Sequence, residues 1–303
     1  MPTSVEIEVI RRSCTQYNEV QWLDIIDRTL YHGVFPAFNH CLQNNVKDLL
    51  PDNIKTKLSQ ASMDTTMQSM RLTGELVQIN RQLNGMGIKA LAFKGPALAK
   101  IAYGDINQRQ FSDLDIFIKR TDFRKVIPLM EAKGFQALFP IEKFIYDKVM
   151  FEMNNDCGFY KQQKNILVEF HWDFFRKLAI STDKFAPWAD TETIVIDQFE
   201  ITTLKPETHL LYHSLHGSKH VWERLFWILD LDRFIRAHDN LEWDELLTKS
   251  SSMGAQKMFL LGIALAIKYF DTPVPAVINQ RCQAAKFENV IAYVENEFGQ
   301  ENP

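Results

Sequence analysis

Apolar residues in the first third of the chain recur every three or four positions, which is the spacing of one face of a helix. This pattern predicts three helices, over residues 22–31, 34–42 and 51–83. Pro51 suits the start of the third helix, and Asn84-Gly85 suits its end. We therefore expect residues 1–86 to form an N-terminal helical region.

From Ile88 onward, short apolar runs of the strand type replace the helical spacing. Strands are expected over residues 88–93, 111–118, 135–139 and 166–173, and a hairpin over 150–153 and 158–162. Short helices are expected over residues 97–102 and 123–132. These elements predict a mixed sheet of four or five strands backed by helices, and we place this α/β core at residues 87–204.

Helical spacing returns after Thr203. Helices are predicted to start near residues 206, 222, 243 and 258, with a last helix after Pro275. The segment 258–270 is apolar on nearly all sides, which is typical of a buried helix. Residues 205–303 are therefore expected to form a C-terminal helical region, and the expected fold class is α+β, with a small mixed β-sheet core between two helical regions.

The composition is that of a globular protein without a basic surface. Hydrophobic residues make up 46% of the 303 residues, charged residues make up 24%, and the formal net charge is −4. Dedicated nucleic-acid binders usually present an electropositive surface, so we do not expect a nucleic-acid partner.

The sequence predicts neither an export signal nor a membrane span. Residues 1–14 carry charges and lack the apolar stretch of a signal peptide, and the longest apolar run, 259–267, is too short to cross a bilayer. The cysteines are scattered, which argues against a zinc site or a disulfide framework; they are Cys14, Cys41, Cys157 and Cys282. We therefore expect a cytoplasmic protein with no membrane partner.

Acidic side chains lie on two of the expected strands. Because side chains alternate along a strand, Asp113 and Asp115 share one face, and their apolar neighbours share the other. Glu169, His171 and Asp173 likewise share one face of the later strand. Carboxylate oxygens are the ligands that Mg²⁺ prefers, often together with phosphate oxygens of a substrate. An acidic pair of this kind is a weak signal when it stands alone.

The order of these features resembles the nucleotidyltransferase superfamily with polymerase β-like folds. A strand ending in Lys-Gly comes first, then Asp-x-Asp on a strand, then one carboxylate on a later strand. The closer resemblance is to a bacterial family of uncharacterised nucleotidyltransferases, and it extends over roughly residues 20–235. Its motifs match Lys94-Gly95-Pro96-Ala97-Leu98-Ala99, Tyr103-Gly104, Arg109, Asp113-x-Asp115 and Val168-Glu169-Phe170-His171-Trp172.

The resemblance implies metal-dependent transfer of a nucleoside monophosphate from a nucleoside triphosphate to an acceptor hydroxyl. Asp113 and Asp115 would bind two Mg²⁺ (or Mn²⁺) ions, and Glu169 would complete the ion that activates the acceptor. The acceptor, a small molecule or a protein, cannot be identified from the sequence. His171 and Asp173 are expected to lie next to the metal ligands.

Phosphate binding is expected from six residues, which are Lys94, Gly95, Arg109, Ser112, Lys219 and His220. Glycine allows a phosphate to approach the backbone closely, whereas Pro96 offers no N–H there, so the charge of Lys94 would take on more of the binding. Arg109 could bind phosphate with both sides of its guanidinium group. It could instead pair with one of three carboxylates, which are Asp105, Asp113 and Asp173.

A histidine stripe is predicted on the helix that starts near residue 206. Its spacings of four, three and four place His209, His213, His216 and His220 on one face. No carboxylate lies among them, so structural or substrate-facing roles are favoured over metal binding. Three tryptophans are expected in the core rather than against a base, and these are Trp222, Trp227 and Trp243.

Two alternative functions remain open at this stage. In a glycosyltransferase, Asp-x-Asp would bind a metal and a nucleotide sugar, but the first 86 residues look helical rather than strand-rich. The other alternative is a non-catalytic module that binds a nucleotide or a partner protein on the same fold.

Overall fold

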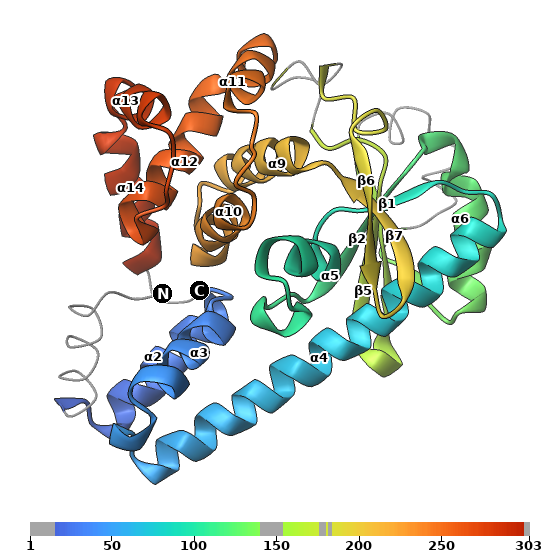
Figure 1. The fold of residues 1–303 in the computed structure, drawn as a ribbon. Coiled ribbons are helices and arrows are strands. Elements are labelled where there is room, and N and C mark those ends of the chain that lie inside the picture. Colours follow the sequence, from blue (N-terminus) through green and yellow to red (C-terminus); the bar gives the residue numbers. More distant parts are fainter. Residues whose placement is uncertain (1–15, 140–153, 176–179, 181–183, 300–303) are drawn as a thin grey trace.

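The computed structural model describes residues 16–139, 154–175, 180 and 184–299. The expected strand at 150–153 lies outside these residues. Three N-terminal helices are present as predicted, and these are α2 (Glu19–Tyr31), α3 (Phe35–Asn45) and α4 (Asp52–Gly85). A capping box fixes the start of α2, because Asn18 and Gln21 each accept a hydrogen bond from the other's backbone N–H. Figure 1 shows α4 extending from α2 and α3 to the sheet.

The central sheet has five strands and is mixed, as predicted. The strands are β1 (Ala90–Ala92), β2 (Asp113–Ile118), β3 (Gln136–Ala137), β4 (Asp156–Lys161) and β5 (Ile166–His171), in the order β1-β2-β5-β4-β3. Only the pair β2–β5 is parallel. β1 is shorter than the predicted 88–93, because Ala90 already pairs with Ile118, the last residue of β2. β5 likewise ends at His171 rather than at Asp173.

A two-stranded sheet between the core and the C-terminal helices was not predicted. It consists of β6 (Thr191–Ile196) and β7 (Phe199–Leu204), which pair antiparallel. The connecting residues Asp197 and Gln198 both have positive φ, at 47° and 68°, as a tight type I′-like hairpin turn requires. The signal in the sequence was the pair of β-branched runs on either side of this two-residue turn.

The C-terminal part is helical, as predicted. Its helices are α9 (Pro206–Lys219), α10 (Leu225–Ala237), α11 (Trp243–Ser252), α12 (Gln256–Phe270), α13 (Ala276–Ala284) and α14 (Glu288–Gly299). The helix predicted from residue 222 starts only at 225, because Val221 and Trp222 have left-handed backbone angles that interrupt a helix. The single helix expected after Pro275 is two helices, α13 and α14. Among the residues that the structure describes, none of the helices combines the length and hydropathy of a membrane span.

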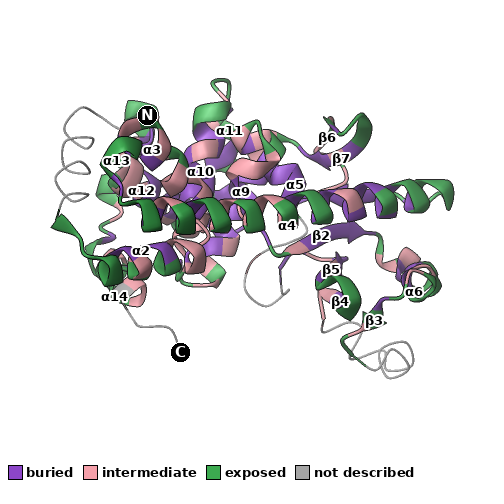
Figure 2. Ribbon diagram, turned by 90° about the horizontal axis from the view of Figure 1, so that it is seen from below, coloured by how far each residue is buried: buried purple, intermediate pink, exposed green. Residues whose placement is uncertain are grey.

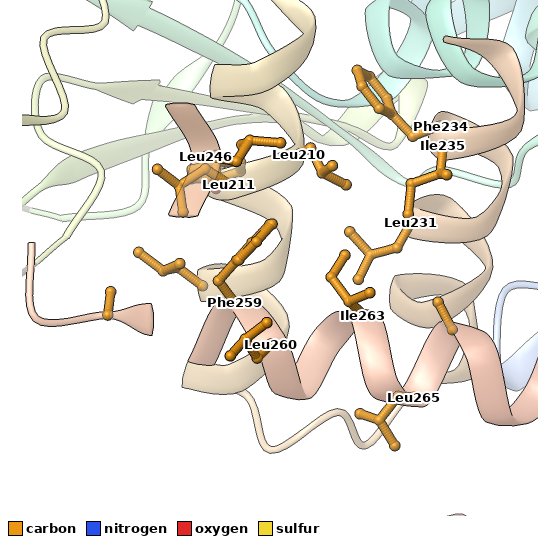
Figure 3. Packing of buried hydrophobic residues seen from close by; sticks show 14 of the residues in the cluster. Leu210, Leu211, Leu231, Phe234, Ile235, Leu246, Phe259, Leu260, Ile263 and Leu265 are labelled. Atoms are coloured by element: carbon orange, nitrogen blue, oxygen red, sulfur yellow. The ribbon is translucent and has the colours of Figure 1, made fainter. Parts of the chain in front are cut away.

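The two faces of the sheet pack against different partners. Leu114, Ile116 and Ile118 of β2 join a buried cluster with residues of α4 and of α6 (Phe123–Ala132). Phe117 lies on the opposite face and joins the cluster formed mainly by the C-terminal helices. Figure 3 shows the centre of that cluster, where side chains of α9, α10 and α12 meet. Asp113 and Asp115 alternate with these three apolar residues of β2, so they face the C-terminal helices.

Between the core and the N-terminal helices, α5 (Gly95–Leu98) and a π-helical turn (Ala99–Tyr103) follow β1 where a helix at 97–102 was predicted. In Figure 2, α4 crosses the whole molecule with a largely exposed outer face, while its other face reaches the buried β2 region. The core therefore has α4 on one side and the C-terminal helices on the other.

Trp222 is buried between two helices that approach it through glycine. A Cβ on Gly217 of α9 would lie 2.4 Å from the indole, and one on Gly262 of α12 would lie 2.8 Å from it. Real side chains do not approach so closely, and the large, enclosed ring cannot move away easily. The absence of side chains at these two positions therefore allows α9 and α12 to pack on Trp222.

We expect Gly262→Ala to destabilise the protein by about 1–3 kcal/mol in urea-induced unfolding, although alanine is the better helix former. Gly74→Ala is the matched control, since Gly74 lies inside α4 with no neighbouring atom within 4 Å of a new Cβ. This control should raise stability by about 0.5–1 kcal/mol. Equal stabilisation by both variants would contradict the packing argument.

Candidate active site

The acidic residues come together because β2 and β5 run parallel. In this register Asp115 lies opposite Glu169, and Asp113 lies opposite Leu167. Asp115, Glu169 and His171 each offer a ligand atom within 4.8 Å of the others. Asp113 lies outside that group because it precedes Asp115 by two residues, on the same face of β2. His171 thus lies beside Asp115 and Glu169, two of the residues predicted as metal ligands.

Asp115 is completely buried and has two cationic neighbours. Its Oδ1 lies 2.9 Å from Lys94 Nζ and 3.0 Å from His171 Nε2. Burial would raise the pKa of Asp115, but Lys94 and His171 lower it below its ordinary value. Burial opposes the charged form of His171, yet its hydrogen bonds to Asp115 and Glu169 raise its pKa to about 9. Asp115 Oδ2 is buried and lacks a hydrogen-bond partner among the described residues.

Asp113 carries the opposite perturbation. Burial and the neighbouring Asp115 raise its pKa to about 6, and Glu169 acts in the same direction. Asp113 and Glu169 both line a cavity in front of the sheet, whereas Asp115 lies behind them. Lys94 and Arg109 oppose this shift but do not reverse it.

The Lys94-Gly95 turn packs directly on the acidic strand. Gly95 has a φ of +52°, and a Cβ there would lie 3.2 Å from the carbonyl oxygen of Asp113. Only glycine combines this left-handed backbone with so close an approach. The turn therefore brings Lys94 into contact with Asp115 and leaves Gly95 on the cavity wall.

The cavity has a volume of about 410 Å³, which is within the range of small-molecule sites. All three parts of the chain contribute to its walls. The core provides Lys94, Gly95, Arg109, Gln110, Phe111, Ser112, Asp113 and Glu169; the C-terminal helices provide His213, His216, His220, Arg224, Phe226, Trp227 and Asp230; and the N-terminal helices provide Leu30, Tyr31, Gly33 and Gln68.

Arg109 does not pair with any of the three carboxylates considered from the sequence. Its Nε and Nη2 each lie 2.8 Å from an oxygen of Asp230 on α10, and Tyr103 also donates to Asp230. Burial would lower the pKa of Arg109, but Asp230 raises it. The two-sided contact predicted for a phosphate is therefore made to a protein carboxylate, and only Nη1 lies outside this ion pair, 3.5 Å from the Gln110 carbonyl.

Two of the other predicted residues do not reach the cavity. Lys219 is exposed, because each residue turns a helix by about 100° and His220 takes the cavity-facing position instead. Asp173 follows the end of β5 and accepts a hydrogen bond from the backbone N–H of Phe175. Ser112 is exposed and does line the cavity.

The histidine stripe is divided between the core and the cavity. His209 is fully buried, whereas His213, His216 and His220 line the cavity. Trp227, which was expected in the core, stacks on His220 with ring centroids 5.1 Å apart and also faces the cavity. Trp222 is in the core, as predicted.

The N-terminal helices cover the cavity through the turn that follows α2. The guanidinium of Arg224 lies 3.6 Å from the centroid of the Tyr31 ring, and the N–H of Phe226 donates to the carbonyl of His32 at 3.1 Å. Gly33 has a φ of +68°, and a Cβ there would lie 2.9 Å from the Phe226 ring. This turn therefore fits closely against the start of α10.

The donor set fits a hard divalent cation better than a transition metal. Asp113 and Glu169 provide carboxylate oxygens at the cavity, and Asp115 adds a buried oxygen without a hydrogen-bond partner among the described residues. In the absence of a metal, the raised pKa of His171 makes its ring a counter-charge to Asp115 and Glu169. Such a site can bind a cation together with phosphate oxygens.

Sequence reasoning missed Asp230 as the partner of Arg109 and missed the aromatic wall. Asp230 lies inside the apolar pattern of α10, and a buried acid in such a pattern is a signal for an ion pair. No comparable signal marks Tyr31 or Phe226, since their cavity positions depend on how the helices dock.

One comparison with known proteins identifies a family. A family model described as an uncharacterised nucleotidyltransferase matches residues 18–271. Two solved structures are similar: an antigenic nucleotidyltransferase-like protein from Paracoccidioides brasiliensis (16% identity, TM-score 0.41, 65% of this chain and 93% of that one) and the antibiotic-resistance factor ANT(2'')-Ia (10% identity, TM-score 0.37, 78% and 100%). The search of curated proteins found no match.

We expect Asp230→Asn to destabilise the fold by about 3–5 kcal/mol, because it leaves the buried Arg109 charge without its counter-ion. Urea-induced unfolding measures this change. Asp24→Asn is the matched control, since it removes an equally short but exposed ion pair to Arg28 and should change stability by less than about 1 kcal/mol. Similar effects of the two substitutions would show that the Arg109–Asp230 pair contributes no more than a surface pair.

Proposed function

Because the chain belongs to the family of uncharacterised nucleotidyltransferases, we propose that it transfers a nucleoside monophosphate from a nucleoside triphosphate to an acceptor hydroxyl. The observation that carries this proposal is the concentration of carboxylates beside Lys94 at one cavity wall. Asp113 and Glu169 face the cavity together, and the pKa of Asp113 is raised to about 6 by burial and by its acidic neighbours. A bound divalent cation would relieve this repulsion.

Asp113, Asp115 and Glu169 would provide the ligands for Mg²⁺ or Mn²⁺. The bound metal would neutralise charge on the triphosphate and activate the acceptor hydroxyl, and a two-ion arrangement is part of the proposal. Lys94 and His171 orient Asp115 through contacts of 2.9 and 3.0 Å. Their contacts use Oδ1 and leave Oδ2 without a partner in the described part of the chain.

Phosphate contacts are proposed for the cationic and backbone groups around the acidic wall. Lys94, Gly95, Ser112 and His220 line the cavity and lie close enough together to border one ligand. Arg109 is assigned a narrower role than its residue type suggests, since Asp230 occupies two of its nitrogens. Its charge and Nη1 would act on the ligand while Asp230 keeps the side chain in place.

The reaction itself would depend mainly on position and charge. The acceptor oxygen attacks the α-phosphorus, the bond to the β-phosphate oxygen breaks, and pyrophosphate leaves with that electron pair. Glu169 and Lys94 both line the cavity; Glu169 would act on the acceptor hydroxyl and Lys94 on the phosphates. The acceptor can be a small molecule or a protein segment that enters this cavity.

The glycosyltransferase alternative is not supported by the fold. That architecture places a strand-rich nucleotide-binding half before the acidic pair, whereas residues 16–89 contain helices and turns. A non-catalytic nucleotide-binding module on the same fold is the remaining alternative. Labelled transfer and ligand-induced stabilisation separate it from an enzyme.

We expect Asp113→Asn to lower nucleotidyl transfer by about a thousandfold or more, because it removes one ligand of the metal that stabilises charge in the transition state. Transfer can be measured with each α-labelled nucleoside triphosphate, Mg²⁺ and an extract that supplies acceptors. Without metal the melting temperature of the variant should be no lower than that of the parent, because the substitution removes a carboxylate that is close to Asp115 and Glu169. The increase in melting temperature on adding Mg²⁺ and triphosphate should shrink.

Glu131→Gln is the control, because Glu131 is an exposed carboxylate of α6 outside the cavity. It should leave both transfer and metal-dependent melting unchanged. Full transfer by the Asp113 variant would exclude the proposed metal site. Stabilisation of the parent by triphosphates without transfer to any acceptor would instead favour the non-catalytic module.

A further inference from the structure

A chain of hydrogen bonds leads from the backbone of β1 to the cavity wall. Thr203 Oγ1 donates to the carbonyl oxygen of Ala92 at 2.6 Å, and His209 Nε2 lies 2.8 Å from the same Oγ1. His209 Nδ1 lies 3.4 Å from Nε2 of His213. The two imidazole planes differ by only 5°, which suits a contact in the plane of both rings.

The hydrogen bond from Thr203 to Ala92 determines which atom is the donor in every other bond of this chain. A carbonyl oxygen only accepts, so the single hydroxyl proton of Thr203 points to Ala92. Thr203 Oγ1 must then accept from His209, whose proton is on Nε2. A neutral His209 has a lone pair on Nδ1, and that lone pair accepts the Nε2 proton of His213.

Both rings are expected to be neutral near pH 7. Burial lowers the pKa of His209 to about 3, with His238 acting in the same direction. Burial also lowers the pKa of His213 well below its ordinary value; His209, Arg109 and Lys94 add to the shift, and Asp115 opposes it. The remaining ring contacts are the uncharged Tyr212 and Phe234. A neutral His213 with its proton on Nε2 has a lone pair on Nδ1.

This chain of hydrogen bonds uses Nε2 of His213 and does not use its Nδ1. Within the described part of the structure Nδ1 makes no hydrogen bond, and His213 is one of the cavity-lining residues. The cavity wall therefore presents an acceptor with fixed polarity at this point. A phosphate oxygen, which also only accepts, would be repelled there, whereas an O–H or N–H group would be bound.

We propose that His213 is a specificity-determining residue whose Nδ1 accepts a hydrogen bond from a hydroxyl or amino group on the nucleoside part of the triphosphate. The proposal rests on the proposed function, since it takes a nucleotide as the ligand. It assigns the nucleoside part to the α9 wall and leaves the phosphates to the wall formed by Lys94 and Ser112. The donor is a ribose hydroxyl or an amino group of the base, and both have the same hydrogen-bonding chemistry.

Analogues that lack one donor test the proposal on the parent protein. Dissociation constants in Mg²⁺ are compared for each nucleoside triphosphate, for its 2′-deoxy and 3′-deoxy forms, and for purine riboside triphosphate, which lacks the amino group of ATP. We expect one of these deletions to weaken binding about fivefold to tenfold, which is typical of one buried neutral hydrogen bond. A sugar analogue would identify the ribose, and the purine analogue would identify the base.

Two substitutions then connect that difference to His213. His213→Phe should bind the complete nucleotide and the deletion analogue equally, because the acceptor is gone while the ring shape remains. Thr203→Val should reduce the difference in affinity between the complete nucleotide and the deletion analogue, although Thr203 lies outside the cavity. Without the Thr203 hydroxyl, the proton of His209 is no longer held on Nε2. Thr203→Ser keeps the hydroxyl and is the matched control, which should behave as the parent.

Nitrogen NMR of the imidazole rings tests the chain without a ligand or activity. In the parent at pH 7, His209 and His213 should both be neutral with the proton on Nε2. A proton on Nδ1 of His213, or a charged His213 ring, would overturn the proposal. So would unchanged discrimination in His213→Phe, or no discrimination by the parent. If the parent binds no triphosphate at all, the proposed function fails as well, and that result differs from binding without discrimination.

Discussion

Parallel pairing between β2 and β5 determines where each acidic side chain of the site lies. It sets Asp115 directly opposite Glu169 and places Asp113 two residues earlier on the same face of β2. The opposite face of β2 is apolar and packs on α4 and α6, so a register slip of one residue would turn the carboxylates into that core. The apolar half of the strand therefore stabilises the register that the acidic half requires.

The same register brings several carboxylates close together, and their charges are accommodated in two different ways. Asp115 lies deepest and is neutralised by Lys94 and His171, which keep it ionised despite complete burial. Asp113 and Glu169 lie nearer to the cavity, where burial and mutual repulsion raise the pKa of Asp113. Removing the two inner cations would leave a buried, unpaired carboxylate, which is among the most costly arrangements in a protein interior. The inner part therefore keeps Asp115 ionised, and the outer part faces the cavity.

Most of the fold follows from local periodicity, and so does the grouping of acidic side chains on each strand; that the two strands form one site was implied by the family resemblance. Alternation along two strands was enough to group Asp113 with Asp115, and Glu169 with His171. The partner of Arg109 could not be found in this way, since Asp230 is 121 residues away and meets it only after α10 docks on the core. The β6–β7 hairpin was overlooked although its two-residue turn was visible. The aromatic wall depends on helix packing that no local pattern encodes.

Docking of the helical regions therefore does more than cover the core. The Arg109–Asp230 pair joins α10 to the segment before β2, and the contact of Phe226 with His32 joins the N-terminal helices to the same helix. The cavity exists only where these contacts meet. Because an unpaired, buried Arg109 charge would be strongly unfavourable, the ion pair with Asp230 keeps α10 in place on the core.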